Sequence, residues 1–143
     1  MRARTRRNER GSATLELVIV IPGTLLLISL IVMAGRLALA HQAIQAVAYD
    51  AARAASVARD RTTASSSANQ VASFALSSNG LSCVSTNTSV NTSGFNAAVG
   101  QNSTVSATVS CTVRLGDLSL PGVPGSVTLT ADAISPIDTY RER

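Results

Sequence analysis

The chain has 143 residues, all twelve of its basic residues are Arg, and it contains no Lys. The absence of Lys excludes Schiff-base chemistry that needs a lysine and the phosphate-binding P-loop. With one His and two Cys, the chain cannot assemble a four-ligand zinc site from those residue types. We therefore expect no cofactor of these kinds.

The net charge of +4 is concentrated in the first ten residues. These carry five Arg and one Glu, whereas the remaining chain carries seven Arg and seven acidic residues and is neutral overall. A basic cluster confined to a terminal tail is typical of membrane topology and not of a nucleic-acid-binding surface. We therefore expect the cytoplasmic membrane as a partner and no nucleic acid.

Nineteen consecutive uncharged residues follow this tail, from Leu17 to Gly35. A helix of that length spans roughly 28 Å, close to the ~30 Å hydrocarbon core of a bilayer. Five Arg before the segment and only Arg36 just after it place the N-terminus in the cytoplasm and residues 36–143 outside. A buried core helix is the alternative, but a chain with four aromatic residues offers little to cover it. Pro22 removes a helical hydrogen bond and predicts a kink.

A cleavable secretory signal is a second alternative, because Ala38-Leu39-Ala40 supplies an A-x-A cleavage site. Three details favour a retained helix. The apolar stretch exceeds the usual 7–15 residues, Glu16 lies within its first turns, and Arg36 separates its end from the cleavage site. Release after Ala40 would produce a secreted binding or adhesive domain.

Glu16 is a carboxylate in the apolar part of the expected membrane helix. An acid at the centre of such a helix costs roughly 3 kcal/mol, and somewhat less near the interface. The helix N-terminal dipole could stabilise it as a tolerated edge residue. Alternatively, Glu16 has a specific cationic partner.

The run from Arg10 to Glu16 resembles the processing site of type IV prepilins, with a basic leader, Gly11, a small residue and Glu at the fifth position after the Gly. This resemblance implies that prepilin peptidase cuts between Gly11 and Ser12 on the cytoplasmic side. The helix would stay on the mature protein as anchor and assembly element. The new amino group of Ser12 would then pair with Glu16 of a neighbouring subunit, which offsets part of the burial cost.

Further motifs resemble the TadE-like pseudopilins of tight-adherence (Tad/Flp) pilus systems. They are Pro22-Gly23, Gly35-Arg36, His41-Gln42-Ala43, the Tyr-Asp-Ala-Ala-Arg-Ala-Ala run over 49–55, Leu120-Pro121-Gly122 and the Ile-Asp-Thr-Tyr-Arg run over 137–141. The resemblance implies a structural, non-enzymatic minor pseudopilin for assembly of a pilus used in adhesion, biofilm formation and surface colonisation. Its partners would be prepilin peptidase, other pilins and pseudopilins, and the Tad assembly platform.

Beyond Arg36 the helix is expected to continue to about Asp60. Apolar residues recur there at three- and four-residue spacing, which predicts one buried stripe: Leu37, Ala40, Ile44, Val47, Ala51, Ala55 and Ala58. The spacing of Ala68, Val71, Ala72 and Ala75 predicts a short second helix over 63–76, ended by a turn at Asn79-Gly80.

Period-two alternation predicts two strands, over 104–115 and 126–133, and an edge strand over 81–90. In the strongest one an inward set alternates with Ser and Thr: Val105, Ala107, Val109, Cys111, Val113 and Leu115. The Pro- and Gly-rich connection over 121–125 cannot be regular structure. We predict a pilin-like α+β fold in which the long helix packs on an antiparallel sheet of about three strands.

The expected organisation is a leader (1–11), a transmembrane helix (12–35), its exposed continuation (36–61) and a small extracytoplasmic α+β domain (62–143). Cys83 and Cys111 then lie outside the membrane, where oxidation is favoured, so a disulfide worth roughly 3.5 kcal/mol is expected, with two free buried thiols as the alternative. The chain has no C-x-x-C motif and its five Asp residues are scattered, so neither residue type indicates catalysis.

Overall fold

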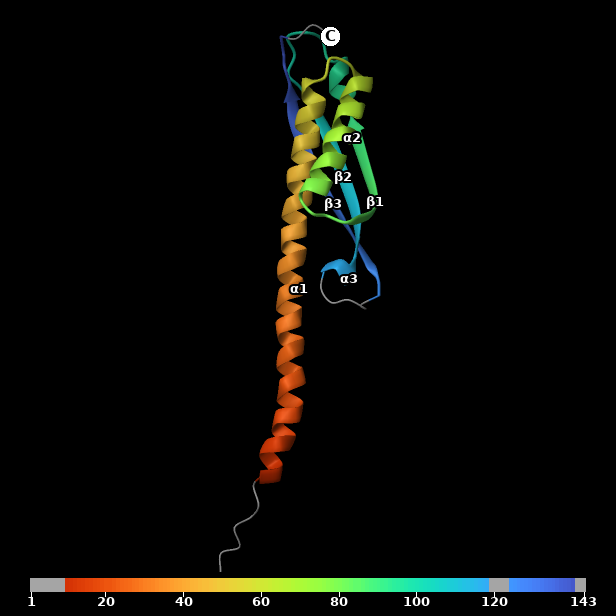
Figure 1. The fold of residues 1–143 in the computed structure, drawn as a ribbon. Coiled ribbons are helices and arrows are strands. Elements are labelled where there is room, and N and C mark those ends of the chain that lie inside the picture. The colour runs from red at the N-terminus through yellow and green to blue at the C-terminus, as the bar shows by residue number, and fades with distance from the viewer. Residues whose placement is uncertain (1–9, 119–123, 141–143) are drawn as a thin grey trace, which may run out of the picture.

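The computed structural model describes residues 10–118 and 124–140. Its elements are α1 (Arg10–Val57), α2 (Arg61–Ser78), β1 (Cys83–Asn91), the short 3-10 helix η1 (Ser93–Asn96), β2 (Ser103–Arg114), α3 (Leu115–Leu118) and β3 (Ser126–Ile137). Figure 1 shows α1 extending far beyond a small domain, in which α2 and the upper part of α1 lie against the sheet. The predicted α+β fold class is confirmed.

Helix α1 is 48 residues long and continues across Pro22 without a break. Proline lacks the backbone N–H that would extend the helical ladder. Close by, the Thr24 hydroxyl donates to the carbonyl oxygens of Val20 and Ile21, at 2.6 and 3.0 Å. This side chain therefore meets its hydrogen-bonding need inside its own helix. The kink at Pro22 stays a prediction.

The sheet has the order β1-β2-β3 with both pairs antiparallel, so β2 is central. Side chains of β2 alternate as predicted, and its inward set is buried: Val105, Ala107, Val109, Cys111 and Val113. The opposite face carries Ser and Thr, and the Thr112 and Thr128 hydroxyls hydrogen-bond across β2 and β3 at 3.0 Å. The strand ends at Arg114, so the expectation that Leu115 belongs to it is wrong. Leu115 instead begins α3.

The predicted stripe on α1 packs into the core. Ala40, Ile44, Val47, Ala51, Ala55 and Ala58 are all buried, and Leu37 packs against them. The buried face is wider than predicted, because Ala48 and Ala52 are also fully buried. Helix α1 contacts both α2 and the sheet, so two of its faces are covered. The small Ala side chains allow this close approach on both sides.

The end of α1 differs from the expectation, since the helix stops at Val57 and α2 begins at Arg61. Asp60 causes the break because it is the N-cap of α2, with extended backbone angles and a carboxylate that accepts a 2.8 Å hydrogen bond from the Thr63 backbone N–H. The Thr62 and Thr63 hydroxyls also donate to this carboxylate. A capping Asp competes with helix continuation at this point.

These hydrogen bonds make Asp60 sensitive to acid. The Thr62 hydroxyl, followed by the Thr63 backbone N–H and hydroxyl, lowers the pKa of Asp60 from 3.8 to about 2. The ionised Asp60 carboxylate therefore stabilises the folded state fully above about pH 4. This contribution to the free energy of unfolding should be lost as the pH falls from about 4 to 2. Asp60→Asn should remove this dependence while keeping a good cap, and Thr62→Ala should weaken it. Thermal unfolding of detergent-solubilised protein across this range measures both, and an identical acid profile in all three proteins would contradict the assignment.

Strand β3 runs to Ile137 and is longer than predicted. Its last part is anchored because Ile137 is buried and the Ser135 hydroxyl donates to the Ser56 hydroxyl of α1 at 3.0 Å. Ser56 is 7% exposed and is the one buried polar side chain among the described residues. The Leu120-Pro121-Gly122 motif lies outside the described residues.

Candidate functional site

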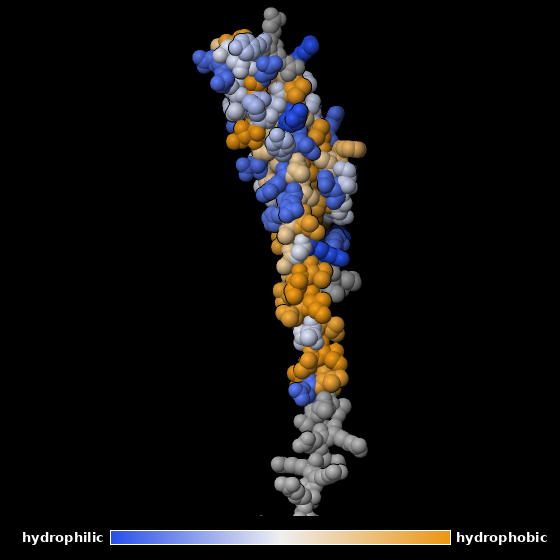
Figure 2. Space-filling view, turned by 90° about the vertical axis from the view of Figure 1, so that its left-hand side faces the viewer, coloured by the Kyte–Doolittle hydropathy of each residue, from blue (hydrophilic) through white to orange (hydrophobic). Residues whose placement is uncertain are grey.

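The lower half of α1 stands apart from the domain. Its apolar side chains from Leu17 to Val32 are exposed, with Ile19 reaching 73%, while Ala40 further along is only 5% exposed. We call residues 17–35 the bare segment. This part of α1 is long and apolar enough to cross a membrane, and none of its most apolar stretch is buried in the protein. Figure 2 shows hydrophobic side chains covering the protruding rod, in contrast to the mixed surface of the domain.

Exposed apolar surface on this scale is not stable in water. A soluble domain rarely exposes a contiguous apolar patch of more than a few hundred Å², and the bare segment exposes Leu, Ile and Val on all sides. Two environments can cover a helix that is apolar all round, namely lipid and other helices. The predicted alternative of a core helix in a soluble protein is therefore wrong, because the domain leaves the segment uncovered.

Gly11 and Ser12, the residues of the expected processing site, lie in the first turns of α1, which begins at Arg10. The preceding basic residues of the expected leader, up to residue 9, lie outside the described residues. The terminal turn of a helix is held by few backbone hydrogen bonds and opens easily. A peptidase could therefore reach the Gly11–Ser12 bond without unfolding the rest of α1.

Glu16 is exposed and directly precedes the bare segment, next to Leu17. No cationic partner for its carboxylate is found among the side chains that the structure describes. Ser12 precedes it by four residues, so the two positions lie on the same face of α1, one turn apart. A partner from another molecule could therefore approach Glu16 along this face.

The described residues do not form a convergent catalytic site. A hollow of about 390 Å³ lies at the α1–α2 turn and contains Arg59 and Asp60, but the Asp60 carboxylate already caps α2. A second hollow of about 340 Å³ lies beside Phe74 and has Asp50 as its one charged lining residue. Across residues 10–118 and 124–140, no group of three His, Cys, Asp or Glu side chains could hold a metal ion. The bare segment is thus the feature with the clearest functional meaning.

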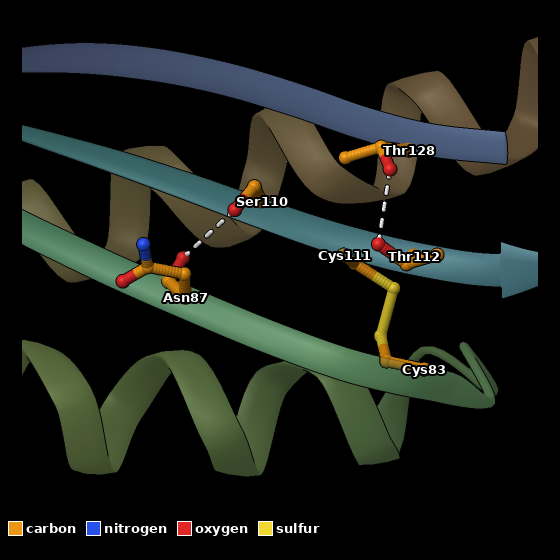
Figure 3. The surroundings of a disulfide bond; sticks show 6 residues. All are labelled: Cys83, Asn87, Ser110, Cys111, Thr112 and Thr128. Carbon is orange, nitrogen blue, oxygen red and sulfur yellow. Dashed lines mark hydrogen bonds between the residues drawn. A yellow bond between two sulfur atoms is a disulfide. The ribbon is translucent and has the colours of Figure 1, made fainter.

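A disulfide joins Cys83 at the start of β1 to Cys111 in β2, with a Cα–Cα distance of 5.4 Å (Figure 3). Cys111 is fully buried and Cys83 packs against the core from the edge strand. The two strands are connected through residues 92–102 at the opposite end of the hairpin. The disulfide therefore closes the end of the hairpin that the chain leaves open.

Sequence reasoning missed the contact between Ser56 and Ser135, which ties α1 to β3. These residues are 79 positions apart, and nothing in the local pattern distinguishes them from the other Ser residues of the chain. It also missed the role of Thr24, although a Thr directly after Pro-Gly in an apolar helix could have suggested bonding to the preceding carbonyls.

An uncovered apolar helix that continues without a break into a small α+β domain indicates membrane anchoring through this helix. Residues 11–53 match the family model TadE, described as TadE-like protein, which confirms the predicted resemblance over this part of the chain. The match covers most of α1 and leaves α2 and the sheet outside it. No curated protein and no solved structure matches the chain.

Proposed function

We propose that this chain is a minor pseudopilin that is held in the cytoplasmic membrane by α1 and takes part in assembly of a Tad/Flp pilus. Its N-terminus faces the cytoplasm and its α+β domain lies outside. Prepilin peptidase matures it by cutting between Gly11 and Ser12. Its role is structural, in a pilus that serves adhesion, biofilm formation and surface colonisation, and its partners are other pilins and the Tad assembly platform.

One observation carries this proposal: the bare segment follows Gly11 and Glu16 in α1, and all of these residues lie within the segment that matches the TadE family. The matched segment begins at Gly11, on the amino side of the proposed cut. An anchor alone would need only apolar residues, because an acid in the membrane is costly. The presence of Glu16 therefore favours an assembly role in addition to anchoring.

The helix geometry gives Glu16 a plausible partner after maturation. The cut would create an amino group on Ser12, four residues or roughly 6 Å along the axis from Glu16. A neighbouring helix displaced by about this distance would bring its Ser12 amine level with the Glu16 carboxylate. Such a pair offsets part of the cost of both charges and sets the axial register between subunits.

The proposed cut predicts the N-terminus of the mature protein. Protein extracted from membranes of cells that contain the pilus system should begin at Ser12 by mass spectrometry or Edman degradation. Gly11→Val should prevent the cut. Gly35→Val is the matched control, since it lies on the same helix with open space around its Cα, and it should be processed normally. An intact Met1 in the wild-type protein would contradict the proposal.

The same measurement separates this function from secretion. Signal peptidase cleavage after Ala40 would produce a protein beginning at His41 and found in the culture medium. It would also remove Leu37 and Ala40, which pack against the core, and it would start the chain inside α1. The burial of Ala40 therefore favours the retained helix, and a soluble product beginning at His41 would overturn the pseudopilin proposal.

A further inference from the structure

The membrane-facing end of the sheet can be located relative to the bare segment. The hydrogen bond between Ser135 and Ser56 ties β3 to α1 at one height, and both elements run in the same direction (Figure 1). Ser126 begins β3, and the strand covers roughly 30 Å between Ser126 and Ser135. A helix covers the same length in about twenty residues, which leads from Ser56 back to Arg36.

The lower end of the sheet therefore lies at the level of Arg36. Arg114 of β2 pairs with Ser126 there, and α3 follows directly. Figure 1 shows α3 at the lower end of the sheet and beside α1, and the two helices are in contact. Arg36 is the first charged residue after the uncharged stretch, so it marks the outer boundary of the hydrocarbon core. Because α1 is unbroken, no flexible linker separates this boundary from the domain.

We propose that the end of the sheet formed by Arg114, Ser126 and α3 rests on the outer membrane–water interface and that Arg114 binds lipid phosphate. Arg114 is exposed, and a guanidinium donates several hydrogen bonds in a geometry that suits phosphate. Arg36 comes from the helix layer and Arg114 from the sheet layer. The domain then contacts the membrane surface through both its helix layer and its sheet layer. These two contacts limit how far the domain can tilt relative to the membrane. This inference rests on the membrane anchoring in the proposed function.

The absence of Trp from the chain allows a direct test with single-Trp variants of the full chain in vesicles. Ser126→Trp reports on the lower end of the sheet. Ser89→Trp is the matched control, because it is also an exposed Ser, and it pairs through Thr108 with Asp132, roughly 20 Å further up β3. Ile19→Trp reports on insertion of the bare segment. The vesicles contain zwitterionic and anionic phospholipids with a nitroxide quencher either on the headgroup or deep in the acyl chain.

Headgroup nitroxide in both leaflets should remove most of the emission of the Ser126→Trp protein and little of that of the Ser89→Trp protein, whichever way the protein inserts. Chain nitroxide should quench Ile19→Trp. Equal quenching at positions 126 and 89, with Ile19→Trp quenched, would overturn the interfacial contact alone. An unquenched Ile19→Trp would instead overturn membrane anchoring, and with it the proposed function. Adding Arg114→Gln to the Ser126→Trp protein should lessen the headgroup quenching, and unchanged quenching would overturn the assignment of Arg114 to phosphate.

Discussion

Replacing Glu16 by Ala should leave the protein in the membrane and remove most of its incorporation into pili. Membrane insertion becomes easier because an acid is removed from an apolar helix, a gain of up to roughly 3 kcal/mol. If Glu16 pairs as proposed, assembly becomes harder because the Ser12 amine of the neighbouring subunit loses its partner. Breaking a buried ion pair costs about 3–5 kcal/mol, which corresponds to more than a hundredfold in the association equilibrium.

The measurement compares the amount of protein in the membrane with the amount in pili sheared from the cell surface. Glu16→Gln keeps the size of the side chain and removes its charge, so it should behave like Glu16→Ala. Thr24→Ala is the control, because the Thr24 hydroxyl is already bonded to carbonyls of its own helix. Normal incorporation of the Glu16→Ala protein would mean that Glu16 has no pairing role.

The elements that the sequence predicts well are those whose pattern is local. The stripe from Leu37 to Ala58 and the alternation in β2 both follow from the burial of one face of a regular element. The processing site at Gly11 and the pairing role of Glu16 stay predictions. The turn at Asn79-Gly80 is confirmed because Gly80 adopts a φ of +69°, which suits glycine at a helix end.

The features that the sequence does not predict depend on contacts between distant segments or, at the end of α1, on a local helix cap. Ala48 and Ala52 are buried because α1 has two partners, and one-face periodicity cannot reveal a second partner. The last part of β3 contains Ser135 and Pro136, which weaken the strand pattern, yet Pro136 is tolerated because β3 is an edge strand. The early end of α1 reflects hydrogen bonding by Asp60, which competes with an otherwise helical pattern.

The composition of the core explains why a covalent link matters in this domain. The buried residues of α1 and α2 are mainly Ala, which allows close packing and buries little apolar area per residue. The edge strand β1 adds little more, since most of its side chains are exposed. Three of the four aromatic residues are exposed and do not belong to the core, namely Tyr49, Phe74 and Tyr140. The burial of apolar side chains therefore contributes little to holding β1 in the sheet.

Removal of the disulfide should consequently destabilise the domain strongly. Cys83 and Cys111 are separated by 28 positions, and closing a loop of that size restricts the unfolded chain by roughly 3.5 kcal/mol on the loop-entropy estimate. For a domain of this size, such a loss lowers the unfolding midpoint by roughly 15 °C or more. Thermal unfolding of Cys83→Ala and Cys111→Ala proteins in detergent, followed by circular dichroism, measures the change.

The double variant and a reductant separate the covalent link from side-chain packing. Either single substitution breaks the same bond, so Cys83→Ala with Cys111→Ala should be destabilised little more than either variant alone, a strong non-additivity. Reductant should lower the midpoint of the wild-type protein and leave that of the variants unchanged. Because the link closes the open end of the β1–β2 hairpin, amide exchange should accelerate first in β1 when it is lost. Additive losses together with a wild-type midpoint insensitive to reductant would mean that packing, and not the disulfide, holds the edge strand in place.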